Sequence, residues 1–272
     1  MFDRIVVPFD GPDVLDAVLP TLTRVIGQRD AEIILLKLER PHPEGGGSGE
    51  EDEIPSKFLL NPSRTTRLAR RGAPVEEILA VVEGTEASLV AMASQGRHGL
   101  ARLLFGSLIE RVIRSCPAPV LAVRAKEDVE PRDVHTVLLP IDESLDWKAS
   151  AACAADLARR HEAAVIVLRA TSPEGREAAE RQAHELCGEL VSAGVVAYAF
   201  VEEGAPASVI PRAAADHEAD LIVMATHPRH GLSRLRLGGV MEDVLREARV
   251  PVMAVPAALS TAWVPAQAMV EE

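Results

Sequence analysis

The sequence predicts an α/β protein made of two tandem doubly wound domains, each a five-stranded parallel sheet flanked by helices. Short apolar, β-branched runs alternate with helix patterns along the chain, and the chain matches itself after a shift of 132 residues. "VVPFD" at Val6 matches "LLPID" at Leu138, and "PVLAV" at Pro119 matches "PVMAV" at Pro251. Between Glu86 and Ser107, twelve of twenty-two residues are identical in the second copy. Such self-similarity indicates a duplicated domain.

The repeat sets the domain limits. Residues 1–132 are expected to form the first domain, residues 133–257 the second, and residues 258–272 an irregular tail. The copies differ most between the second and third strands. There the first copy has a Gly-, Pro- and acid-rich stretch around residues 41–57, which predicts a flexible loop with at most one short helix. The second copy has a full helix pattern at the same place.

Continuous apolar runs indicate strands buried on both faces, as in a parallel sheet. The predicted strands are Ile5–Phe9, Ile33–Leu38, a weak Thr65–Ala69, Leu89–Ala93 and Val120–Val123, then Val137–Ile141, Val165–Leu168, Val195–Val201, Leu221–Ala225 and Val252–Val255. The predicted helices are Val14–Ile26, Val75–Val82 and Leu108–Arg114, then Trp147–Arg160, Glu177–Ala193, Ala207–Ala215 and Val240–Arg246. The two fifth strands would be exposed edges, so we expect them to pair across the domains as an intramolecular pseudo-dimer.

Composition excludes several classes of function. The 272 residues are 47% hydrophobic and 26% charged, with a net charge of −12, which is typical of a globular protein and disfavours nucleic-acid binding. No apolar run approaches the ~20 residues of a membrane span. The first residues lack the layout of a signal peptide, and the three cysteines are far apart. We therefore expect a cytoplasmic protein with no membrane or nucleic-acid partner.

The segment "MASQGRHGLARLLFGS", from Met92 to Ser107, carries the chemistry. Its glycines allow tight turns and a close approach to a ligand. Gly106 and Ser107 are predicted to open the last helix, with "SLIE" as a capping box. The free N–H groups of a helix N-terminus attract anions, and Arg97 adds positive charge.

Asp10 follows the first strand and is expected at the same sheet edge as this segment. Together they predict a nucleotide pocket, with phosphates on the glycine loop and a sugar hydroxyl or a metal ion at Asp10. The alternative is that the glycines serve only a turn and that Ser107 only starts a helix.

The order of "VVPFD", "GAP", "MASQG", nine residues, "GS" and "CPAPVLAV" resembles the universal stress protein family, and the resemblance runs through both copies. Nucleotide-binding members of that family carry Gly-x-x-Gly-x9-Gly-Ser/Thr. The first domain matches this motif from Ala93 to Ser107, with Ala93 in place of the first glycine. The resemblance implies an ATP site, with or without Mg²⁺, formed by Pro8, Asp10, Leu38, Met92, Ala93, Gly96, Arg97, Gly106, Ser107 and Leu108.

The second copy of the motif is degenerate. Pro228 replaces the second glycine, which fixes φ and removes an N–H donor, and Gly239 lacks the hydroxyl of Ser107. Pro140 and Asp142 remain. We therefore expect at most one nucleotide site per chain, in the first domain.

Three functions remain open after this comparison. The first is ATP binding with a regulatory role in the stress response; the second is a nucleotide-free interaction scaffold of the same fold; the third is slow ATP hydrolysis. The sequence has no Ser-His-Asp elbow and no Walker loop, and it predicts no catalytic residue and no metal-ligand spacing of histidines. A homodimer stays open as a further partner of the chain.

Overall fold

A computed structural model describes residues 2–27, 31–39, 64–95, 101–124, 133–143, 147–226 and 239–259, with the side chains of residues 94, 95 and 101–107 left outside the description. The chain divides into two compact units, Met1–Val129 and Glu130–Glu272. The two-domain α/β architecture is confirmed. The boundary at residue 132 and the pairing of the two fifth strands stay predictions, and the predicted loop at 41–57 and most of the tail lie outside the described residues.

The first unit is a five-stranded parallel sheet with the strand order β3-β2-β1-β4-β5. Its elements are β1 (Arg4–Phe9), α1 (Pro12–Ile26), β2 (Glu32–Glu39), β3 (Thr65–Arg71), α2 (Pro74–Thr85), β4 (Leu89–Gln95), α3 (Ala101–Ser115) and β5 (Val120–Arg124). α1 packs against β1, β4 and β5, and α2 packs against α3. The strands and helices alternate as predicted.

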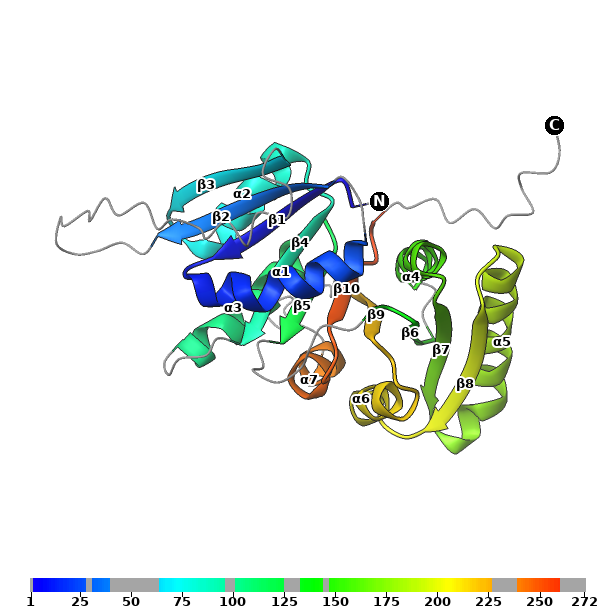
Figure 1. Ribbon diagram of the computed structural model, residues 1–272. Coiled ribbons are helices and arrows are strands. Elements are labelled where there is room, and N and C mark those ends of the chain that lie inside the picture. The colour runs from blue at the N-terminus through cyan, green and yellow to red at the C-terminus, as the bar shows by residue number, and fades with distance from the viewer. Residues whose placement is uncertain are drawn as a thin grey trace. The chain divides into compact units, whose positions relative to one another are not determined.

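The second unit repeats this topology with the strand order β8-β7-β6-β9-β10. Its elements are β6 (Thr136–Ile141), α4 (Lys148–His161), β7 (Ala164–Thr171), the 3₁₀ turn η3 (Pro173–Gly175), α5 (Arg176–Ser192), β8 (Ala197–Glu203), α6 (Pro206–Asp216), β9 (Leu221–Thr226), α7 (Gly239–Glu247) and β10 (Val252–Pro256). In Figure 1, α5 runs beside β7 and β8, where it packs.

The central strands carry the core of each unit. Ile5, Val6 and Val7 of β1 are fully buried, and so are the matching Val137, Leu138 and Leu139 of β6. Burial on both faces explains why these runs are continuously apolar instead of alternating.

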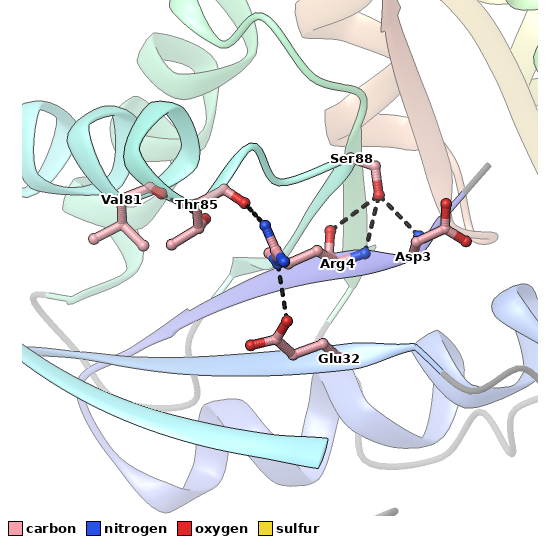
Figure 2. A network of polar contacts seen from close by, with 6 residues as sticks. All are labelled: Asp3, Arg4, Glu32, Val81, Thr85 and Ser88. Atoms are coloured by element: carbon pink, nitrogen blue, oxygen red, sulfur yellow. Dashed lines mark hydrogen bonds and ion pairs between the residues drawn. The ribbon is translucent and has the colours of Figure 1, made fainter.

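The amino end of the first sheet is closed by a polar network (Figure 2). Ser88 Oγ accepts hydrogen bonds from the backbone N–H groups of Asp3 (3.0 Å) and Arg4 (3.2 Å), and it donates to the Arg4 carbonyl at 3.1 Å. The Arg4 guanidinium pairs with Glu32 at 2.9 Å and also donates to the Thr85 carbonyl. This network ties β1 to β2, α2 and β4 at the end opposite to the predicted site.

Candidate functional site at the carboxyl end of the first sheet

The register of the first sheet brings four predicted residues to two neighbouring levels near its carboxyl end. β1 pairs with β2 through Phe9↔Lys37, so the next residue, Asp10, comes level with Leu38. β1 pairs with β4 through Val6↔Val90, and the same offset continued along both strands brings Pro8 level with Met92. These four residues therefore lie at the carboxyl ends of three adjacent parallel strands.

This end of β1 is the switch point of the winding. From β1 the chain proceeds outward through β2 to β3, then returns to β4 on the other side of β1. In doubly wound sheets the crevice for ligands opens at this point, outside the carboxyl ends of the strands. The predicted residues on β1, β2 and β4 surround that point.

The predicted site residues differ in how far they are exposed to solvent. Pro8, Met92 and Ala93 are buried, whereas Leu38 and Leu108 are half-buried and Asp10 is exposed. Asp10 directly precedes Gly11, which caps α1 with an extended backbone, and Pro12 occupies the first turn. The strand end thus offers an exposed carboxylate beside a half-buried apolar side chain, which suits a ligand with hydroxyl groups and a flat apolar part.

The phosphate side of the predicted site differs from the prediction. We expected Gly106 and Ser107 to open the last helix, but α3 begins at Ala101 and places both residues inside it. Ser107 is therefore not an N-cap, and the capping box at Ser107–Glu110 does not start the helix. The physical reason is propensity: "ARLLF" at residues 101–105 is a run dominated by good helix formers that extends the helix toward its N-terminus.

The helix changes what the two residues offer. In an α-helix the N–H groups of Gly106 and Ser107 bond to carbonyls four residues earlier, so they are not open to an anion. Gly96 and Arg97 lie outside the described residues. The described part of the first domain places Pro8, Asp10, Leu38 and Met92 at the carboxyl ends of the strands, and both the base and ribose side and the phosphate side of the site stay predictions.

The second unit shows the arrangement that was expected of the first. α7 begins at Gly239, which matches Ser107 in the repeat. At the strand ends, Pro140 and Met224 are buried and Asp142 is exposed, as are their counterparts in the first unit. The degenerate residue Pro228 lies outside the described residues.

Sequence reasoning missed Arg169 and Gln182, which contact the carboxyl ends of β6 and β7. Arg169 Nε donates to Gln182 Oε1 at 2.8 Å, and Gln182 Nε2 donates to the backbone carbonyl of Asp142 at 2.8 Å. A signal was present, since a charged residue ends the apolar run "VIVLR" of β7. Its partner Gln182 lies thirteen positions further on in a helix, and no sequence pattern links the two residues.

The described residues also bear on two other kinds of feature, a membrane span and a metal site. Among the described residues, no helix combines the length and the apolar character of a membrane span. Within the same residues, no group of three or more His, Cys, Asp or Glu side chains is placed to hold a metal ion.

The strand order defines a doubly wound α/β protein in which each of the two sheets has a switch point at its central strand. Residues 1–124 and residues 134–256 each match the universal stress protein family. The chain belongs to this family and contains two of its domains.

Known relatives agree with this assignment. The chain is 29% identical over 242 residues to the universal stress protein Rv2005c of Mycobacterium tuberculosis, covering 78% of this chain and 80% of the relative. The crystal structure of a universal stress protein from Archaeoglobus fulgidus covers 93% of this chain and 96% of that chain, with 20% identity and a TM-score of 0.67, a likeness of fold. A universal stress protein solved with cAMP covers 46% of this chain and 98% of its own, with 22% identity and a TM-score of 0.42; cAMP is a ligand of that protein.

Proposed function

We propose that the first domain binds ATP, and that binding serves a regulatory role in the stress response. The observation that carries the proposal is the pairing of levels at the switch point of the first sheet. Asp10 lies level with Leu38, and Pro8 lies level with Met92 two residues earlier along the strands. In this proposal the Asp10 carboxylate accepts a ribose hydroxyl or holds Mg²⁺ beside the phosphates, and the apolar side chains contact the base.

The phosphates extend from this end toward the loop and helix that contain Gly96, Arg97, Gly106, Ser107 and Leu108. A charged phosphate needs N–H donors or cations there. The sequence supplies Arg97, the N–H group of Gly96 and the hydroxyl of Ser107 for that purpose.

We also propose that the protein works in the cytoplasm. Its cysteines support this proposal, because Cys116, Cys153 and Cys187 are all free thiols in the structure. Free buried thiols suit a reducing compartment.

Calorimetric titration with ATP and with adenosine, each with and without Mg²⁺, tests the proposed site. Wild-type protein is expected to bind ATP at one site per chain. Asp10→Ala is expected to weaken ATP by about ten- to a hundredfold, since a hydrogen bond to a charged group contributes about 1.5–3 kcal/mol. If Asp10 binds ribose, adenosine weakens equally; if it holds Mg²⁺, mainly Mg-ATP weakens.

Asp142→Ala is the matched control, because Asp142 is the exposed counterpart of Asp10 in the second domain. It is expected to leave the ATP affinity unchanged. Equal loss in both variants, or no loss in either, contradicts the proposed site.

A second candidate is the nucleotide-free interaction scaffold, and the start of α3 at Ala101 favours it. A helix that runs through Gly106 and Ser107 uses the backbone N–H groups that a phosphate would need. Native mass spectrometry of the purified protein separates the two functions, because a bound nucleotide adds its mass to the chain and a scaffold carries none.

A further inference from the structure

A buried arginine ends the apolar part of β7. Arg169 is 7% exposed, and it is the charged residue among the buried side chains of the described chain. Its neighbours Leu168 and Ala170 are apolar and buried. A guanidinium in such a place is costly unless its donors are satisfied.

Neutral oxygens satisfy this guanidinium. Nε donates to Gln182 Oε1 at 2.8 Å, and Nη1 donates to the carbonyl of Ala170 at 3.0 Å. The carboxylate of Glu143 is 3.8 Å from Nη2 and its side chain is 93% exposed, so this ion pair is loose. Arg169 is thus held mainly by Gln182 and by the end of its own strand.

Gln182 links the arginine to the neighbouring strand end. It lies on α5, which packs against β7 and β8, and its Nε2 donates to the carbonyl of Asp142 at 2.8 Å. With Oε1 accepting from Arg169 and Nε2 donating to a carbonyl, both ends of the amide have suitable partners. We call Arg169 and Gln182, with the two carbonyls that they bind, the clasp.

The clasp uses the positions that the first domain offers to a ligand. In the repeat, Asp142 matches Asp10 and Ala170 matches Leu38. These are the two positions that come level at the end of the first sheet. In the second domain, side chains of the domain itself already bind the backbone carbonyls of both residues.

The first copy has different residues at the two positions of the clasp. Lys37 stands at the position of Arg169, and Glu50 stands at that of Gln182. A carboxylate has no amide N–H to donate to a strand-end carbonyl, so a glutamate at this position cannot make the bridge that Gln182 makes. Glu50 itself lies outside the described residues.

We propose that Arg169 and Gln182 exclude the nucleoside part of a nucleotide from the second domain. A base or ribose that bound there would have to displace the guanidinium and the amide from their acceptors, leaving a buried cation without partners. The second domain is therefore closed at its base end as well as altered in its phosphate motif. This proposal rests on the proposed function of the first domain, because it identifies the ligand edge by that site.

The test is adenosine titration of three proteins by calorimetry. Adenosine has no phosphate, so the degenerate phosphate motif of the second domain does not influence it. Arg169→Ala/Gln182→Ala removes the clasp and opens its space, whereas Arg169→Met/Gln182→Met removes the hydrogen bonds but keeps the volume filled. The opened variant is expected to bind one more adenosine per chain than wild type, and the filled variant the same number as wild type.

Arg181→Ala is the matched control. Arg181 neighbours Gln182 on α5 but is exposed and pairs with Glu177, so its loss removes a charge without touching the clasp. It is expected to bind as wild type does. An opened variant that melts as a folded protein but gains no adenosine site overturns the proposal.

If the doubly substituted opened variant does not fold, the single variant Gln182→Ala tests the proposal instead. It frees the Asp142 carbonyl, keeps Arg169, and is expected to show the additional site with weaker affinity; no additional site overturns the proposal. The wild-type titration reports separately on the first domain. If wild type binds no adenosine while a clasp variant binds one, the proposed function fails and the clasp stands.

Discussion

Ser88 in the first domain and Asp220 in the second occupy matching positions and make the same kind of contact. Ser88 Oγ accepts from the N–H groups of Asp3 and Arg4, and Asp220 Oδ2 accepts from those of His135 (2.8 Å) and Thr136 (3.0 Å). At the amino end of each sheet, one side-chain oxygen therefore accepts hydrogen bonds from two consecutive backbone N–H groups, although the side chain is a serine in one domain and an aspartate in the other. We expect these contacts to affect stability and not binding, because they lie at the end of the sheet opposite to the proposed site.

The carboxyl ends of the sheets have not been kept in this way. α3 begins at Ala101 but α7 begins at Gly239, six residues later in the repeat. β7 ends with the clasp, whereas β2 carries Lys37 at the position of Arg169. The comparison teaches that the duplication preserved the framework and that the copies diverged where a ligand would bind.

The outer edges diverged as well. β3 reads "TTRLARR" and is largely exposed, whereas β8 reads "AYAFVEE", with Tyr198 54% and Phe200 37% exposed. Phe200 contacts His217 with ring centroids 4.3 Å apart. α5 packs on β8, where Ala199 is half-buried, while β3 has the exposed Arg67 at the matching place. Basic side chains also protect an edge strand from unwanted pairing.

The largest expected effect is on the free energy of unfolding, and it tests the contact that the amino ends of both sheets share. Asp220→Ala removes a carboxylate that holds two backbone N–H groups and is expected to lower the free energy of unfolding by about 2–3 kcal/mol. Ser88→Ala removes a neutral acceptor and is expected to cost about 1–2 kcal/mol. Urea unfolding, followed by hydrogen exchange to assign each transition to its domain, measures both.

Asp220→Ser is the control for this pair, because serine is what the first domain uses. It is expected to be less destabilising than Asp220→Ala. Equal losses in the serine and alanine variants would mean that the oxygen at this position does not hold the strand ends.

The strands and the two-domain fold were predictable from the sequence, because they depend on patterns of neighbouring residues. All ten predicted strands are present, including the weak one at Thr65–Ala69, which extends to Arg71 as β3. Buried parallel strands leave continuous apolar runs that short-range patterns detect. Asp10 and Met92 were placed at one sheet edge for the same reason, since parallel strand ends meet there.

The start of α3 and the clasp were not predictable in this way. The Ser-x-x-Glu pattern at Ser107 indicated a helix start, but the helix formers from Ala101 to Phe105 outweighed it. In the second copy, two consecutive glycines at 238 and 239 weaken the helix at the same point. The clasp joins Arg169 to Gln182 through the packing of α5 on β7, which no local pattern encodes.

The next expected effect concerns the divergent helices. Ser107→Ala is expected to weaken ATP by about tenfold or more but adenosine very little, because the serine serves the phosphates in the proposed site. Since α3 begins at Ala101, Ser107 is no helix cap, and alanine favours a helix interior. The melting temperature without nucleotide is therefore expected not to fall.

Gly239→Ala in the second domain is the matched change, at the first residue of α7. It is expected to leave the ATP affinity unchanged, because among the described residues no atom lies within 4 Å of where the added methyl group would be. A fall in the melting temperature of Ser107→Ala with unaltered ATP affinity would assign Ser107 a structural role and would remove it from the site.

The smallest expected effect compares the buried thiols of the two domains. Burial raises the pKa of Cys116 in the first domain from 9.0 to about 11, and it raises the pKa of Cys153 in the second to about 12. Cys187 is half-buried, and burial raises its pKa as well. Because the thiolate is the reactive form, alkylation at pH 8 is expected to be fastest at Cys187 and slowest at Cys153.

The same shifts predict how stability changes at high pH. Each folded pKa lies above the unfolded value, so the contribution of each thiol is complete below pH 9 and is lost as the pH rises through the folded pKa. Stability is therefore expected to fall from pH 9 toward pH 11 in the first domain and toward pH 12 in the second. Cys153→Ala removes the part of this loss that Cys153 causes in the second domain and leaves the part that Cys187 causes, so the difference from wild type isolates Cys153. Mass spectrometry of the alkylated peptides checks the order of reactivity, and Cys153 reacting as fast as Cys187 would show that α4 opens far more readily than its buried side chains imply.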